Sequence, residues 1–150
     1  MKIKYIIKDK ITYKELQKLF KEMDSIKGDR FWAHDIFHYS WRTKKQEEIA
    51  LKKSTFITAR INKQLIGLVR LVDDGVYDFY VAEVMVIPSL QGKGIGKELM
   101  NKTIDYCKKV GFIKIFISAL PGKETYYQKF GFKPAMSQVL EIKFKDIKND

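Results

Sequence analysis

A run of small and basic residues near the middle of the chain, Gln91-Gly92-Lys93-Gly94-Ile95-Gly96-Lys97, has the composition of an anion-binding turn. It follows an apolar stretch, Val81 to Ile87, and leads into a helical pattern that extends to Lys109. Glycines let the backbone adopt positive φ and approach a ligand closely, and the unpaired N–H groups at a helix start point at an anion. The segment therefore predicts a phosphate cradle at a strand-to-helix turn, with Lys93 and Lys97 adding cationic side chains.

The common nucleotide-binding motifs do not fit this turn. A Walker-type loop requires a serine or threonine after Gly-Lys, and here Glu98 follows Gly96-Lys97, so no hydroxyl is placed for magnesium. A Rossmann turn requires Gly-x-Gly-x-x-Gly, whereas these glycines occupy positions 92, 94 and 96. Since tight turns and helix packing also select glycine, the turn needs support from elsewhere in the chain.

That support is a family pattern in two blocks. Gln91, Gly94 and Gly96, preceded by Val84-Met85-Val86-Ile87-Pro88, resemble the acetyl-CoA loop of the GNAT superfamily of N-acetyltransferases. After the next apolar strand, Tyr126-Tyr127-Gln128-Lys129-Phe130-Gly131-Phe132 resembles the family's Tyr-x-x-hydrophobic-Gly-Phe signature. The resemblance is specific over Val81 to Pro134 and uninformative for Gly28 to Lys53.

The resemblance implies an enzyme that transfers an acetyl group from acetyl-CoA directly to a primary amine of a small molecule or protein. No covalent acyl-enzyme and no metal are implied. The matching positions place CoA against the turn, the strand end before it and the tyrosine helix: Met85, Val86, Gln91, Gly92, Lys93, Gly94, Ile95, Gly96, Lys97 and Tyr127. At Met85 and Val86 only the backbone carries this role.

Two side chains are candidates for proton transfer in that reaction. Tyr127 matches the family's tyrosine and would protonate the departing sulfur; the alternatives are a packing role, or Tyr126 if the register differs by one. Glu83, on the strand before the turn, is the candidate base; the alternatives are a salt-bridged strand glutamate, or Asp78 acting with a water chain. A strand N–H near Val86 would stabilise the oxyanion.

One segment departs from the usual family pattern. Many members carry an asparagine before the tyrosine helix, where this chain has Leu120-Pro121-Gly122-Lys123. The variant resembles a Pro-Gly subgroup that includes arylalkylamine-like, small-molecule members. It puts the asparagine contact to CoA in doubt and leaves the proposed chemistry intact.

The elements that position these residues follow from hydrophobic periodicity and turn signals. A capping box at Thr12-x-x-Glu15 predicts a helix to Met23. The chain is expected to form strands over 1–7, 54–60, 64–72, 77–87, 113–117 and 139–144, with helices after the glycine turn and around Tyr126. The predicted fold is mixed α/β: a GNAT-like, mostly antiparallel central sheet with flanking helices and one parallel, splayed strand pair.

Composition limits the class of protein. The 150 residues are 45% hydrophobic, enough for one domain over 1–150 with a core that needs no metal or disulfide. No apolar run approaches the roughly twenty residues that cross a bilayer. The N-terminal segment indicates a strand, not a signal peptide, and Cys107 is the only cysteine, so we expect a cytoplasmic protein with no membrane partner.

The net charge of +11 attracts anions without identifying a partner. The basic residues are spread along the chain and only four are arginine, so we interpret them as a solvated coat and do not expect nucleic acid as a partner. The alternative function is a non-catalytic CoA-binding sensor or a nucleic-acid-associated module.

Three further features concern metal binding, nucleophilic catalysis and the acceptor pocket. His34 and His38 are spaced like a zinc motif, but no third histidine exists and no metal is expected. Cys107 lies in an apolar helical stripe and is not expected to be a nucleophile. Aromatic residues between Phe31 and Trp41 favour an acceptor pocket, a satellite core or a dimer surface, so homodimer formation stays open.

Overall fold

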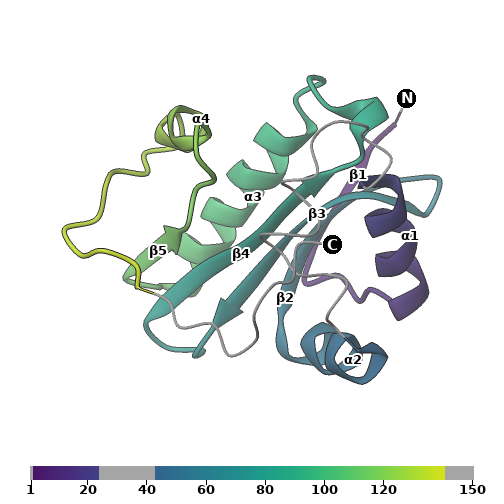
Figure 1. Cartoon of the computed structure of the whole chain (residues 1–150), viewed down its shortest axis with the longest axis horizontal. Coiled ribbons are helices and arrows are strands. Elements are labelled where there is room, and N and C mark those ends of the chain that lie inside the picture. Colours follow the sequence, from purple (N-terminus) through teal and green to yellow (C-terminus); the bar gives the residue numbers. More distant parts are fainter. Residues whose placement is uncertain (1, 24–42, 141–150) are drawn as a thin grey trace, which may run out of the picture. The chain divides into compact units, whose positions relative to one another are not determined.

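The computed structural model describes residues 2–23 and 43–140 (Figure 1). The chain divides into two compact units, Met1–Ile117 and Ser118–Asp150. The single domain expected over 1–150 stays a prediction.

The first unit holds a five-stranded sheet in the order β1-β2-β3-β4-β5. All neighbouring strands are antiparallel except β4 and β5, which are parallel, and this arrangement confirms the predicted mixed α/β fold class. Along the chain the elements are β1 (Lys4–Ile7), α1 (Tyr13–Met23), α2 (Lys44–Lys53), β2 (Thr55–Ile61), β3 (Gln64–Asp73), β4 (Asp78–Val86), the 3-10 turn η3 (Pro88–Leu90), α3 (Ile95–Val110) and β5 (Lys114–Ile117). The second unit contains α4 (Glu124–Gln128).

Side-chain caps start the first two helices. At α1 the Glu15 N–H donates to Thr12 Oγ1 at 3.2 Å and the Thr12 N–H donates to Glu15 Oε2 at 2.9 Å, which confirms the predicted capping box. The same reciprocal pair joins Thr43 and Gln46 ahead of α2. The sequence analysis did not predict α2, because its mostly polar and charged residues show no apolar stripe.

Strand β5 ends before β4 does. Their parallel register runs from Asp78 opposite Lys114 to Val81 opposite Ile117, and β4 then continues to Val86. On its other side β4 stays paired with β3 as far as Val86 opposite Gly67. The last five residues of β4 therefore lie beyond the described pairing with β5, and the splaying of this pair stays a prediction.

A bulge in β4 changes which way its side chains point. Leu71 is opposite Val81 and Arg70 is opposite Glu83, so Ala82 is an extra residue in β4. Consecutive residues of a strand alternate between faces, so Glu83 shares a face with Arg70 and lies opposite to Val81. In Figure 1, α3 runs along the sheet. A Cβ at Gly67 would point toward Leu99 of α3, and Arg70 is three residues further along β3, so its side chain points to the face away from α3.

The close approach of chain segments at Gly67 gives a testable prediction. A Cβ added there would lie 2.8 Å from the Met85 carbonyl oxygen and 3.3 Å from side-chain atoms of Leu99 and Val86. Because the nearest atom is backbone, Gly67→Ala must push β3 from β4, and we expect it to lower the free energy of unfolding by about 1–3 kcal/mol. Chemical denaturation would measure this, and an unchanged midpoint with an unchanged slope would contradict it.

The C-terminal strand expected over 139–144 is not established. Val139 and Leu140 are exposed and outside any strand, so a strand does not begin at Val139, and residues 141–144 lie outside the described residues. Of the helices in the described ranges, none combines the length and the apolar composition needed to cross a membrane.

Candidate functional site

The glycine-rich turn leads directly into the N-terminus of α3. Gly94 is the N-cap residue with φ 80°, and Gly92 has φ 74°, both in the left-handed region that glycine adopts without strain. The first N–H with an acceptor in the helix is that of Glu98, which donates to Gly94 O at 3.0 Å. The N–H groups of residues 94–97 come before it and, among the described residues, have no acceptor.

These groups fit an anionic ligand. A Cβ built at Gly92 or Gly94 would meet no atom within 4 Å, so the turn borders open space. Lys93 and Lys97 are exposed beside it, while Ile95 is buried and anchors the turn to the core. Backbone donors, the positive end of the α3 dipole and two lysines together favour a phosphate or pyrophosphate group.

The Gln91 side chain connects the turn to the end of β4. Its Nε2 donates to the Val86 carbonyl oxygen at 2.9 Å. Gln91 was predicted to bind the cofactor, and the structure shows that its amide also holds the turn against the strand. Gln91 therefore contributes to the shape of the anion-binding turn.

The strand end holds the other residues predicted at this site. Met85 and Val86 are buried residues, at 3% and 9% exposure, and the role of their backbone in binding the cofactor stays a prediction. Glu83 precedes them by two residues and is also buried, at 3% exposure.

Glu83 forms an ion pair that crosses from β4 to β3. Arg70 Nε donates to Glu83 Oε2 at 3.0 Å and Arg70 Nη2 to Glu83 Oε1 at 3.5 Å, while Nη1 donates to Ser54 Oγ at 3.2 Å. A salt-bridged glutamate was one of the alternatives predicted for Glu83, but Arg70 and Ser54 were not identified from the sequence. A signal existed, because Arg70 and Glu83 are single charged residues inside apolar strand sequences, and such charges are usually paired.

In the second unit, α4 carries the tyrosine pair. Gly122 turns with φ 80° and Lys123 precedes the helix, so the Pro-Gly variant forms a tight turn. The Tyr127 ring packs edge-on against Tyr126, at 5.1 Å between centroids, and against Phe132 at 6.1 Å. Its hydroxyl makes no hydrogen bond among the described residues.

Burial controls the acidity of this hydroxyl. Desolvation, and to a lesser extent the neighbouring Tyr126, raises the pKa of Tyr127 to about 12. At neutral pH the phenol therefore stays protonated and keeps its proton to donate. Desolvation also raises the pKa of Tyr126.

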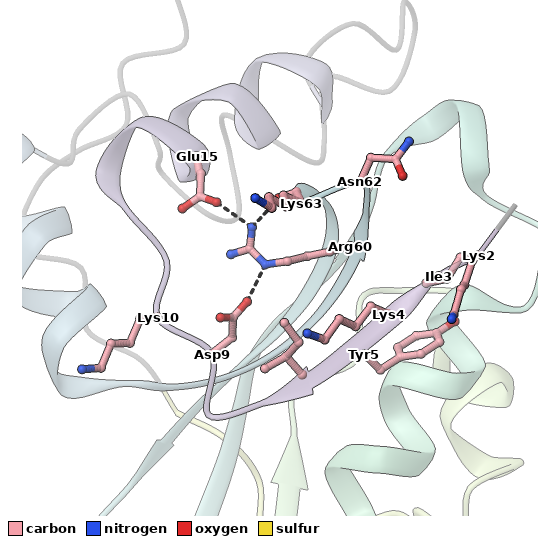
Figure 2. A pocket seen from close by; sticks show the side chains of 11 residues that line it. Lys2, Ile3, Lys4, Tyr5, Asp9, Lys10, Glu15, Arg60, Asn62 and Lys63 are labelled. Atoms are coloured by element: carbon pink, nitrogen blue, oxygen red, sulfur yellow. Dashed lines mark hydrogen bonds and ion pairs between the residues drawn. The ribbon is translucent and has the colours of Figure 1, made fainter.

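A hollow of about 990 Å³ lies at the β1 edge of the sheet (Figure 2). It is lined by Lys2, Ile3, Lys4, Tyr5, Ile6, Asp9, Lys10, Glu15, Arg60, Asn62 and Lys63. Figure 2 shows the Arg60 guanidinium held between Asp9 and Glu15, with both nitrogen–oxygen distances at 2.6 Å. The lysines are exposed along an edge strand, where they discourage pairing with another chain. We interpret this hollow as structural.

The other candidate features either lie outside the described residues or show no activated group. His34, His38 and the aromatic residues from Phe31 to Trp41 lie outside the described residues. Within the described part of the chain, no group of three or more histidine, cysteine, aspartate or glutamate side chains is placed to hold a metal ion. Cys107 is buried in α3, and desolvation, with a smaller contribution from Asp73, raises the pKa of its thiol to about 12, so the thiol is not activated as a nucleophile.

Comparisons with known proteins match the sequence pattern. The family model described as Acetyltransferase (GNAT) domain matches residues 13–146. The protein named Uncharacterized N-acetyltransferase ycf52 of Porphyra purpurea is 31% identical over 96 residues, which cover 61% of this chain and 55% of that protein. The chain thus spans about half the length of this curated relative.

Solved structures show the same fold. A probable acetyltransferase from meticillin-resistant Staphylococcus aureus superposes with a TM-score of 0.73 and 23% identity, covering 95% of this chain and all of that chain. A GNAT family acetyltransferase from Elizabethkingia anophelis with acetyl-CoA bound gives a TM-score of 0.61 and 19% identity, covering 87% of this chain and 76% of that one.

Proposed function

Because the chain belongs to the acetyltransferase (GNAT) domain family, we propose that it transfers an acetyl group from acetyl-CoA to a primary amine. The acceptor is a small molecule or a protein amine, and the transfer is direct, without a covalent acyl-enzyme. We propose a cytoplasmic location and no stable membrane or nucleic-acid partner.

The observation that carries this proposal is the pairing of an anion-binding turn with a strand end. Backbone N–H groups at the start of α3 and Lys93 and Lys97 would hold the phosphates of CoA. The segment of β4 beyond Val81 has no described β5 partner, and the backbone at Met85 and Val86 would hold the pantetheine arm there. Bound there, acetyl-CoA supplies the thioester whose carbonyl carbon the amine attacks.

Residues of this chain would carry out the proton transfers of the reaction. Glu83 accepts a proton from the acceptor's ammonium through a water molecule, since its side chain is almost fully buried. A backbone N–H near Val86 donates to the oxyanion, and Tyr127 donates its hydroxyl proton to the departing sulfur. The product nitrogen loses its second proton to solvent, Tyr127 regains one from solvent, and Glu83 releases to solvent the proton that it accepted, so the proton balance closes.

Glu83 is favoured over Asp78 as the base because of its place in β4. Asp78 lies at the first residue of β4, paired with β5, and its carboxylate is 3.7 Å from the Lys114 amine. Glu83 lies beyond the last described β4–β5 pair, two residues before Met85.

The function is tested by free-thiol release from acetyl-CoA across a panel of amines, with product mass to identify the acetylated acceptor. Acceleration by one or more amines supports the proposal. If CoA binds and no amine reacts, the protein is a CoA-binding module, and if CoA does not bind, the proposal fails.

The turn gives a prediction with a matched control. Gly94→Ala must hold a Cβ at φ 80°, which costs about 1–2 kcal/mol, and relaxation of that strain moves the N–H groups that follow. We expect its affinity for acetyl-CoA to fall at least several-fold in calorimetry. Gly75→Ala places the same strain, at φ 78°, in the turn between β3 and β4, so it should lose similar stability with its affinity unchanged. If both variants and the wild type bind acetyl-CoA with equal affinity, the proposal that this turn binds the phosphates of CoA is wrong.

A further inference from the structure

The Arg70–Glu83 ion pair turns its cationic member toward solvent. The Glu83 side chain is 2% exposed, whereas that of Arg70 is 16% exposed. Both lie on the sheet face opposite to the one that Leu99 of α3 covers. A molecule that approaches this face therefore meets the guanidinium before the carboxylate.

The Arg70 guanidinium has N–H donors that its two described partners, Glu83 and Ser54, do not use. It uses Nε and one Nη2 hydrogen for Glu83 and one Nη1 hydrogen for Ser54. A guanidinium carries five N–H groups, so one remains on each terminal nitrogen without an acceptor among the described residues. Two donors on neighbouring terminal nitrogens are suited to binding a carboxylate through both oxygens.

The charges of Arg70 and Glu83 favour one kind of molecule as the source of a carboxylate bound to Arg70. Glu83 already neutralises Arg70, so a simple anion would place two carboxylates against one guanidinium. A molecule that also carries an ammonium group beside its carboxylate adds no net charge to the pair. The chain's charge of +11 opposes acceptors with several positive charges.

We propose that the acceptor is an α-amino acid or a similar small zwitterion, and that Arg70 binds its carboxylate. The inference rests on the proposed acetyl transfer and makes Arg70 a specificity-determining residue. The acceptor's ammonium then gives a proton to Glu83 through water. This step leaves a neutral amine on the acceptor and a protonated carboxyl on Glu83. The amine nitrogen forms the bond to the acetyl carbon, and the carbon–sulfur bond breaks as sulfur takes the proton of Tyr127.

Matched acceptors test this proposal. Each α-amino acid in a panel is compared with its α-amide and with the amine that lacks the carboxylate, for example phenylalanine, phenylalaninamide and 2-phenylethylamine. For at least one side chain, we expect kcat/KM for the amino acid to exceed that for the amide by about 10- to 100-fold, the range of a charge-assisted bidentate contact.

Variants assign that preference to Arg70. Arg70→Met should reduce the preference to near one, mainly by raising KM for the amino acid. Because this variant leaves Glu83 buried beside an apolar side chain, Arg70→Lys serves as the second variant. Lysine keeps the positive charge but lacks the two planar donors of the guanidinium, so Arg70→Lys should retain part of the preference. Ser54→Ala removes one bond to Arg70 and keeps the guanidinium, so its preference should match the wild type.

The outcomes separate this inference from the proposed function. If amines are acetylated with no preference for the carboxylate in the wild type, acetyl transfer stands and the zwitterion proposal is wrong. A preference that survives in both Arg70 variants also overturns it. If no acceptor in the panel is acetylated, both fail together.

Discussion

Tyr127→Phe is expected to lower turnover by about 10²- to 10⁴-fold, the usual contribution of a general acid, with little change in affinity for acetyl-CoA. Only the hydroxyl is lost, because phenylalanine keeps the ring contacts with Tyr126 and Phe132. Burial raises the pKa of Tyr127 to about 12, so the wild-type phenol remains a proton donor throughout the neutral range. Thiol release with a saturating amine measures turnover, and calorimetry measures affinity.

Tyr126→Phe is the matched control, because it removes the same atom from the adjacent residue of α4. We expect it to stay near wild-type turnover. If the Tyr126 variant is slowed and the Tyr127 variant is not, Tyr126 is the general acid and the assignment to Tyr127 is wrong. If both variants turn over normally, water protonates the sulfur and neither tyrosine is the acid.

The second large effect is on stability. Arg60→Met is expected to reduce the free energy of unfolding by about 3–5 kcal/mol, the range for breaking a buried ion pair from one side. The Arg60 side chain is 10% exposed and joins Asp9 to Glu15, and Thr58 Oγ1 also donates to Asp9 at 2.6 Å. Removing the guanidinium leaves both carboxylates without their main partner. Urea denaturation of the two proteins measures the difference.

Acid titration of the same two proteins checks the cause. Desolvation alone would raise the pKa of Glu15, but hydrogen bonds from the Thr12 backbone and from Arg60 outweigh it and lower the pKa. A carboxylate with a lowered pKa adds stability above its unfolded-state pKa and loses it as pH falls through the folded-state pKa. The wild type's advantage should therefore be complete at neutral pH and shrink below about pH 4.

Lys18→Met is the control, because Lys18 is an exposed residue of α1 and its loss changes the net charge equally. Its stability should stay within about 0.5 kcal/mol of the wild type. A loss as large as that of Arg60→Met would attribute the effect to overall charge instead of the buried network.

Local patterns were sufficient to predict much of this fold. The Thr12–Glu15 capping box, the alternation in β2 to β4 and the glycine turn each depend on residues close in sequence. Periodicity indicates a helix from Lys97 to Lys109, and in the structure this helix begins at Ile95, because Gly94 is its N-cap residue. The parallel β4–β5 pair followed from the strand-helix-strand order.

The missed features depend on residues distant in sequence. Arg60 meets Asp9 and Glu15 across 51 and 45 residues, and no periodicity signals such a contact. Helix α2 was missed for a different reason: its polar composition hides it, although Thr43 and Gln46 have the spacing of a capping box. The position of Arg70 opposite Glu83 depends on the register of two strands and on the bulge at Ala82.

That bulge lets β4 place Val81 and Glu83, which are two residues apart, on opposite faces of the sheet. Ala82 contributes a position, and its presence shifts the side-chain direction of every residue that follows relative to Phe79 and Val81. Substitution at residue 82 leaves these directions unchanged, and so does its deletion, because Val81 and Glu83 would then be consecutive residues that still point to opposite faces. A related sequence can therefore lose the bulge and keep a glutamate opposite Arg70, whereas a regular strand that retained residue 82 would turn Glu83 toward α3.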